Sequence, residues 1–236
     1  MRKPRVRTVA AILATSVIGA ILVYVVYRPW ALNWGASREE IARTMPGDGI
    51  LSNPTFNATR AVTIDATPAE IWPWIAQMGY GKAGFYSYDR LDNDGIPSAN
   101  HIIAEYQQLE TGDSIPLTEH GFVTVTTLEP ESSMLWEYRG DDTTTVFTWA
   151  WGLYPQAGGQ TRLVTRLLWH ASSLRSRAML DLFEIVMMRK CMLGIKRRAE
   201  TANAAGARRT TPDIELEDAT RQEGTMRPKG FEPLAS

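Results

Sequence analysis

The amino-acid sequence predicts an α+β protein in which an antiparallel sheet wraps around a long C-terminal helix, with one transmembrane helix ahead of the domain. Three stretches carry this prediction. Residues 8–27 contain no formal charge, residues 113–170 alternate strand-like segments with turn residues, and residues 177–200 place apolar side chains at helical spacing. Because each element needs an apolar partner face, the sheet and the last helix are expected to cover each other.

The uncharged stretch at residues 8–27 is long enough to cross a bilayer, because twenty helical residues span about 30 Å. Four basic residues precede it, whereas Arg28 is followed by no basic residue before Arg38. This asymmetry favours a cytoplasmic N-terminus, so we expect a single-pass anchor in the cell membrane and an extracytoplasmic main domain. A cleaved signal peptide is the alternative, although its apolar region is usually only about 7 to 15 residues long.

The rest of the chain divides by composition into a spacer, one domain and a tail. After the stub and anchor at residues 1–30, a juxtamembrane spacer is expected at 31–56, a domain at 57–202 and a disordered tail at 203–236. The tail lacks apolar periodicity, which is why disorder is predicted there. In the spacer, Ser37 and a Glu three residues later form a capping box that starts a short helix.

The elements of the domain follow from local patterns. Residues 57–65 alternate as a first strand, and Thr67 with Pro68 opens a helix that ends near Gly79. Residues 85–93 are aromatic and acidic and precede turn residues, which indicates a loop or short helix. Short connections between the later strands imply an antiparallel meander. These strands are expected at residues 114–117, 121–128, 133–138, 144–154 and 160–170.

The composition excludes several classes of protein. The formal net charge is −1, so the basic excess typical of a nucleic-acid binder is missing. The single cysteine, Cys191, allows no internal disulfide and no cluster of soft metal ligands. The sequence also contains no phosphate-binding loop or dinucleotide fingerprint, and therefore no cofactor is expected.

Two sequence blocks resemble a known superfamily. Residues 62–74, VTIDATPAEIWPW, resemble the opening strand and helix of the SRPBCC superfamily, the START-related polyketide cyclase and lipid-binding proteins. Residues 77–89, QMGYGKAGFYSYD, with LDN at 91–93, are similar to a membrane-anchored bacterial branch of it whose function is unknown. The resemblance covers residues 61–198 and implies the helix-grip fold, with a deep cavity between a curved sheet and the C-terminal helix.

Such a cavity predicts a set of candidate ligand-binding residues. Aromatic rings can stack on a flat or polyprenyl ligand, methionines adapt to bulky apolar shapes, and a mid-strand arginine can bind a carboxylate or phosphate head group. The same side chains also suit an ordinary packed core, and a mid-strand arginine usually faces water. The candidates are Trp72, Tyr86, Tyr88, Trp149, Trp151, Arg166, Trp169, Met187 and Met188.

Two functions follow from this picture. The favoured one is a non-catalytic carrier or sensor that holds a lipid or another hydrophobic small molecule beside the membrane. The alternative is a polyketide cyclase or dehydratase-like enzyme in which Asp89 and His101 act as acid and base, as the resemblance suggests. A calcium loop at Asp92 and Asp94 is disfavoured, because its register would place Arg90 and His101 where carboxylates are needed, so no metal site is expected.

The last residues have an unusual composition. Residues 226–236 contain Gly-Phe-Glu-Pro, which the common tRNA sequence GGTTCGAACC encodes in one frame. We hypothesise that an adjacent tRNA gene is translated there, and the alternative is a genuine flexible tail. The genomic DNA decides between them, since the absence of a tRNA gene rejects the hypothesis.

Overall fold

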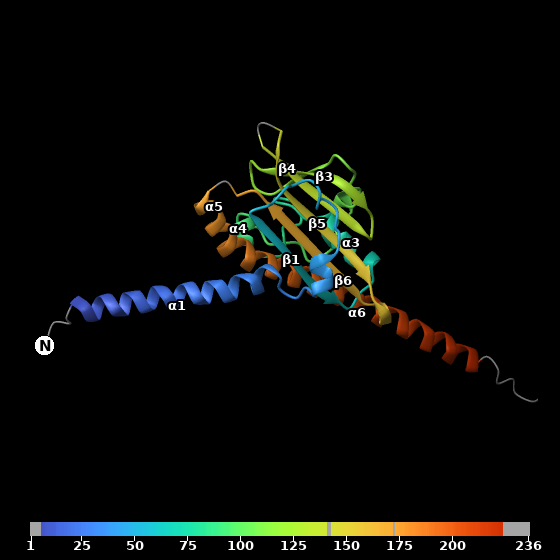
Figure 1. Ribbon diagram of the computed structural model, residues 1–236. Helices are drawn as coiled ribbons and strands as arrows, with labels where there is room; N and C mark the ends of the chain where they lie inside the picture. Colours follow the sequence, from blue (N-terminus) through green and yellow to red (C-terminus); the bar gives the residue numbers. More distant parts are fainter. Residues whose placement is uncertain (1–5, 141–142, 172, 224–236) are drawn as a thin grey trace, which may run out of the picture.

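The computed structural model describes residues 6–140, 143–171 and 173–223. The chain begins with helix α1 (Val6–Leu32), which projects away from the remaining elements (Figure 1). Within the described residues, the segment Thr8–Leu32 of α1 is long and apolar enough to cross a membrane. Most of its large apolar side chains are exposed, from Val9 at 41% to Val26 at 74%, whereas Leu32 at its end is buried.

The predicted α+β class and the antiparallel meander are both confirmed. One sheet of six strands has the order β1-β6-β5-β4-β3-β2, and every neighbouring pair is antiparallel. Strands β2 to β6 are neighbours in the sheet in the same order as in the sequence, and β1 is the edge strand beside β6. The strands are β1 (Phe56–Ile64), β2 (Ser114–Pro116), β3 (Phe122–Glu129), β4 (Ser133–Arg139), β5 (Thr145–Pro155) and β6 (Thr161–Trp169).

Short helices with the expected caps connect these strands. The side chains of Ser37 and Glu40 form the capping box at the start of α2, and Thr67 with Glu70 forms one at the start of α3. Residues 85–93 contain only a single helical turn, as their composition indicated. The helices before the sheet meander are α2 (Arg38–Ala42), α3 (Pro68–Ala76), α4 (Asp89–Asp92) and the 3-10 turn η1 (Ala104–Tyr106); a second turn, η2 (Ala157–Gly159), joins β5 to β6.

The C-terminal helix is longer than the sequence predicts and is interrupted near its start. It comprises α5 (Leu174–Met179), the π-helical segment η3 (Leu180–Glu184) and α6 (Ile185–Glu223). Continuation to Glu223 differs from the disorder predicted from residue 203 onward. An existing helix extends without a new nucleation step, so this segment can continue α6 although it contains Gly206 and Pro212, which disfavour helix. Residues 224–236, with their Gly-Phe-Glu-Pro sequence, lie outside the described part.

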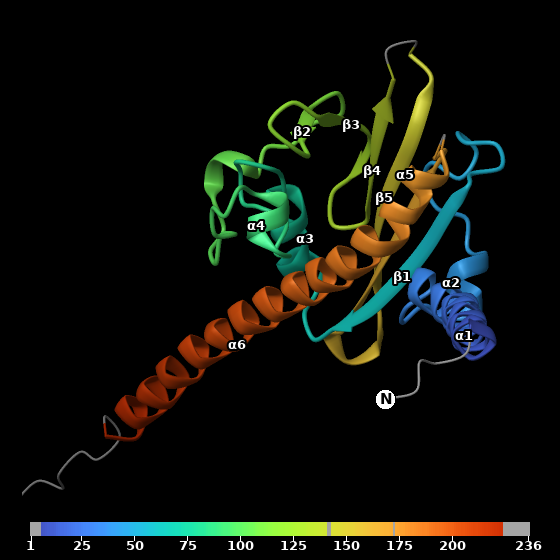
Figure 2. The same cartoon turned by 90° about the vertical axis from the view of Figure 1, so that its left-hand side faces the viewer.

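The two faces of the sheet have different partners. On the inner face, α3 and α6 cover a large apolar cluster that includes Trp136, Trp151 and Met192. On the outer face, Met45 from the juxtamembrane segment packs with Val164 and other small side chains. Figure 2 shows α6 crossing one face of the sheet while α2 lies on the opposite side of β1. The sheet is therefore the middle layer of three.

Candidate ligand-binding cavity

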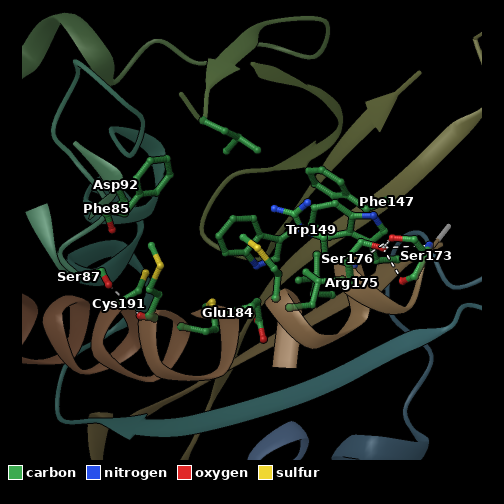
Figure 3. A pocket seen from close by; sticks show the side chains of 17 residues that line it. Phe85, Ser87, Asp92, Phe147, Trp149, Ser173, Arg175, Ser176, Glu184 and Cys191 are labelled. Atoms are coloured by element: carbon green, nitrogen blue, oxygen red, sulfur yellow. Dashed lines mark hydrogen bonds between the residues drawn. The ribbon is translucent and has the colours of Figure 1, made fainter. Parts of the chain in front are cut away.

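A cavity of about 590 Å³ lies between the inner face of the sheet and the C-terminal helix (Figure 3). This volume is within the range of about 300 to 1,000 Å³ that is typical of small-molecule sites. The wall is almost entirely apolar, with few polar groups. It is formed by Phe85, Ser87, Asp92, Leu117, Phe147, Trp149, Leu167, Trp169, Ser173, Arg175, Ser176, Met179, Leu180, Glu184, Met187, Met188 and Cys191.

Aromatic side chains of β5 and β6 form the sheet side of the cavity. Phe147 and Trp169 are directly opposite each other in the ladder, and their ring centroids are 4.6 Å apart. Trp149 stands two residues further along β5, and its indole N–H donates to the Thr165 hydroxyl at 2.9 Å. Because strand residues alternate between faces, these observations place the odd-numbered residues of β5 and β6 toward the cavity.

A second row of tryptophans supports this wall from within the sheet. Trp151 is only 1% exposed, and its ring centroid is 5.1 Å from that of Trp149. Trp136 packs edge-on against both rings, at 5.1 Å from Trp149 and 5.8 Å from Trp151. Trp151 therefore holds the Trp149 ring in place, although it does not line the cavity itself.

The helix side of the cavity is lined by flexible methionine side chains and includes an irregular segment of the helix. Met179, Met187 and Met188 line it, and thioether side chains adapt readily to ligands of different outline. The π-helical segment η3 lies in the middle of this wall. Segments of this kind are rare and are frequently found at functional sites.

One ion pair connects the cavity wall to the sheet. Arg60 of β1 is 1% exposed and donates to Glu184 through Nη1 at 2.5 Å and through Nη2 at 2.8 Å, while its Nε donates to the carbonyl of Ala31 at 2.9 Å. Burial raises the pKa of Glu184, and the positive charge of Arg60 opposes that shift. The pair fixes η3 to β1 and to the end of α1.

The structure brings four of the sequence-predicted residues to the cavity: Trp149, Trp169, Met187 and Met188. The other five predicted residues do not line it. Trp72 is partly buried on α3 against the apolar cluster. Tyr86 is buried, with its hydroxyl donating to the Trp74 carbonyl at 2.9 Å. Tyr88 is 39% exposed.

Arg166 has a structural role on the outer face. Its guanidinium donates to the Thr59 hydroxyl at 2.9 Å, to Asp48 at 2.6 Å and to the backbone carbonyls of Glu40, Ile41 and Arg43. These bonds fasten the juxtamembrane segment to the sheet. Arg166 is even-numbered in β6 and therefore points away from the cavity, because the helix covers the odd-numbered face.

The predicted acid–base pair is not assembled in this structure. Asp89 accepts a hydrogen bond from the Ser98 hydroxyl at 2.5 Å, while the exposed ring of His101 contacts Asn100 at 3.2 Å. Neither residue is part of the cavity wall. Within the described ranges, no group of three or more His, Cys, Asp or Glu side chains could hold a metal ion.

Sequence reasoning did not identify Asp92, Glu184 or Arg60 as residues of this site. Arg60 and Glu184 had a detectable signal, since Arg60 lies on an otherwise apolar face of its strand and Glu184 lies on an apolar stripe of its helix. A charge that faces inward needs a partner. Asp92 had no comparable signal. It ends the single helical turn α4 within the loop that follows α3, and only the packing of that loop against α6 brings it to the cavity.

Three comparisons with known proteins were made. No protein-family model matches this chain. No curated protein matches it either. Similar solved structures include a protein from Nitrosospira multiformis, with 11% identity over 63% of this chain and 99% of the other and a TM-score of 0.42.

Two further solved structures are similar at the same level. CalC, a self-sacrificing resistance protein from Micromonospora echinospora, is 7% identical over 62% of this chain and 95% of its own, with a TM-score of 0.42. A conserved protein of unknown function from Enterococcus faecalis is 15% identical over 85% of this chain and 99% of its own, with a TM-score of 0.40.

Proposed function

We propose that this chain is a membrane-anchored binding protein, a carrier or sensor, that holds a lipid or another hydrophobic small molecule in the cavity between the sheet and the C-terminal helix. The observation that carries the proposal is the cavity of about 590 Å³ with an apolar wall. A hydrophobic ligand bound in an apolar cavity of this size would gain packing contacts with the whole wall. The sheet and long C-terminal helix also support the helix-grip fold of the SRPBCC superfamily that residues 62–74 resemble.

The anchor contributes to the proposal because it contacts the cavity wall. The Arg28 side chain near the end of α1 donates to Asp181 of η3 at 2.9 Å, and the Tyr24 hydroxyl also donates to Asp181. Figure 1 shows α5 at the end of the domain from which α1 projects. If α1 spans the cell membrane with its N-terminus in the cytoplasm, the α5 end of the cavity lies beside the outer bilayer surface, from which a lipid can enter.

Binding is favoured over catalysis by the state of the polar groups in the wall. Glu184 is paired with Arg60, and the Ser87 hydroxyl donates to the Met187 carbonyl at 3.0 Å. Burial raises the pKa of the Cys191 thiol, which disfavours the reactive thiolate at neutral pH. A nucleophile paired with a base, which an acyl or proton transfer site requires, is therefore not found among these lining residues.

The proposal is tested with the full-length protein purified from membranes in detergent. Native mass spectrometry should detect a hydrophobic molecule that stays with the protein. Met187→Trp places a larger side chain in the cavity and should abolish this adduct, whereas Val186→Trp, at the neighbouring exposed position, should retain it. The absence of any adduct, together with no affinity for a panel of lipids, would refute the proposal.

The anchor is tested separately from the cavity. Intact-mass measurement of the protein in the membrane fraction should show that residues 1–30 are retained. A mass that lacks them would identify a cleaved signal peptide and would remove the anchored form of the proposal.

A further inference from the structure

The polar side chains of the cavity wall differ in whether they have partners. Ser173 and Ser176 bond to each other at the α5 end, with their hydroxyl oxygens 3.1 Å apart. Glu184 is held by Arg60, and Ser87 donates to a backbone carbonyl. These groups are satisfied by the protein, and Arg175, the other charged residue at the α5 end, is exposed.

Asp92 is different. Both of its carboxyl oxygens are buried, and neither has a hydrogen-bond partner among the residues that the structure describes. Burial and, to a lesser extent, the charge of Asp89 raise the pKa of Asp92, and the nearby Ser87 and Lys190 side chains oppose that shift only in part. Buried polar groups in native proteins nearly always have a hydrogen-bond partner, and a ligand bound in the cavity would supply one for Asp92.

The surroundings of Asp92 restrict what such a ligand can be. An anionic head group is excluded from this end, because Asp92 itself is acidic and the Arg60 guanidinium is already occupied by Glu184 and the Ala31 carbonyl. An ammonium head group has three N–H donors that each need an acceptor. At this end the wall offers one unpartnered carboxyl group among mostly apolar side chains, so some of these donors would stay without a hydrogen bond. A hydroxyl group needs a single acceptor and suits this environment.

We propose that the Asp92 carboxyl group accepts a hydrogen bond from the hydroxyl head of an aliphatic or alicyclic alcohol bound in the cavity, an inference that rests on the proposed function. Figure 3 shows Asp92 and Phe85 at one end of the cavity and Arg175 and Ser173 at the other. The hydroxyl head therefore lies at the Phe85 end of the cavity, and the hydrocarbon extends past Trp149 toward the α5 end. Because both Asp92 carboxyl oxygens are buried in the structure, this contact requires a rotation of the Asp92 side chain toward the cavity.

The test uses the full-length protein in detergent micelles and four probes with one hydrocarbon chain: 1-tetradecanol, its methyl ether, tetradecanoic acid and tetradecylamine. Binding is titrated by native mass spectrometry for the native protein, Asp92→Leu and the control Glu119→Leu. The control also removes a negative charge, but the Glu119 side chain is 72% exposed and is not part of the cavity wall. Each probe partitions into the micelles equally for all three proteins, so comparison between proteins isolates the effect of the side chain.

Asp92→Leu should weaken binding of the alcohol about tenfold, as expected for one hydrogen bond to a carboxylate, and should change binding of the ether less than about twofold. Glu119→Leu should change neither. Equal binding of the alcohol to native protein and Asp92→Leu would overturn the role of Asp92 while leaving a hydrophobic cavity in place. Tighter native binding of the acid or the amine than of the alcohol would overturn the hydroxyl assignment. Failure of all four probes to bind native protein would overturn the proposed function itself.

Discussion

Replacement of Arg60 by methionine should destabilise the protein by unpairing a carboxylate in the cavity wall. In the native protein the Arg60 side chain is 1% exposed and that of Glu184 14% exposed, and two hydrogen bonds of 2.5 and 2.8 Å join them. Removal of one partner from a buried ion pair typically costs about 3 to 5 kcal/mol. Because burial already raises the pKa of Glu184, its carboxyl group can take up a proton, so we expect the lower end, about 3 kcal/mol.

This loss is large enough to measure by thermal unfolding. For a chain of this size, about 3 kcal/mol corresponds to a decrease in Tm of about 6 to 12 °C. The full-length Arg60→Met protein in detergent is heated while the near-ultraviolet circular dichroism of its tryptophans is followed. The destabilisation should be greatest above the folded pKa of Glu184 and should shrink as pH falls through that pKa, since the unpaired group is then neutral.

The double variant Arg60→Met/Glu184→Leu decides whether the ion pair is the cause. If it is, the double variant removes both charges and should lose much less stability than the sum of the two single variants. Additive losses, or a single-variant Tm within about 1 °C of native, which corresponds to less than about 0.5 kcal/mol, would refute the reasoning.

Three further predictions concern packing, pH and the anchor. Gly194→Ala should cost about 1 to 3 kcal/mol in thermal unfolding, because the added Cβ would lie 2.3 Å from the Tyr86 carbonyl oxygen. Asp92→Leu should raise stability at pH 7 by about 1 kcal/mol. Burial raises the folded pKa of Asp92 above its unfolded value, so the native protein bears the penalty above the folded pKa. The gain in stability from Asp92→Leu should therefore shrink as pH falls through that pKa. Asp181→Asn should speed amide hydrogen exchange in α5 and η3 and lower the Tm by about 2 to 4 °C, the effect of about 1 kcal/mol, because it weakens a partly buried pair in which the Asp181 side chain is 8% and the Arg28 side chain 30% exposed.

Matched controls separate each prediction from a general effect of substitution. Gly49→Ala adds a Cβ with no atom within 4 Å and should leave the Tm unchanged. Glu119→Leu, the control for Asp92→Leu, should show no pH-dependent gain in stability. Lys196→Gln breaks the partly exposed pair with Glu200 further along α6 and should not alter exchange in α5. If a variant and its control show the same change in Tm, in pH dependence or in hydrogen exchange, the physical reason given for that variant is wrong.

The sequence alone determined the local elements of this protein. Strand alternation, turn residues and the capping box at Ser37 act over a few residues, so they are readable without knowledge of distant contacts. The uncharged stretch of α1 is equally local. For this reason the order of helices and strands, the antiparallel meander and the capped helix starts are all found where the patterns indicate them.

Only the tertiary structure decided which side chains face the cavity. Arg60 and Arg166 both stand in the middle of strands and look alike in sequence, yet Arg60 bonds to Glu184 on the inner face and Arg166 to Asp48 on the outer face. Alternate residues of a strand point to opposite sides of the sheet, and the local sequence does not say which side is the inner one. That is determined by where the C-terminal helix and the juxtamembrane segment pack. Asp92 reaches the cavity because its loop is held against α6 by contacts across about a hundred residues, and local patterns carry no information over that separation.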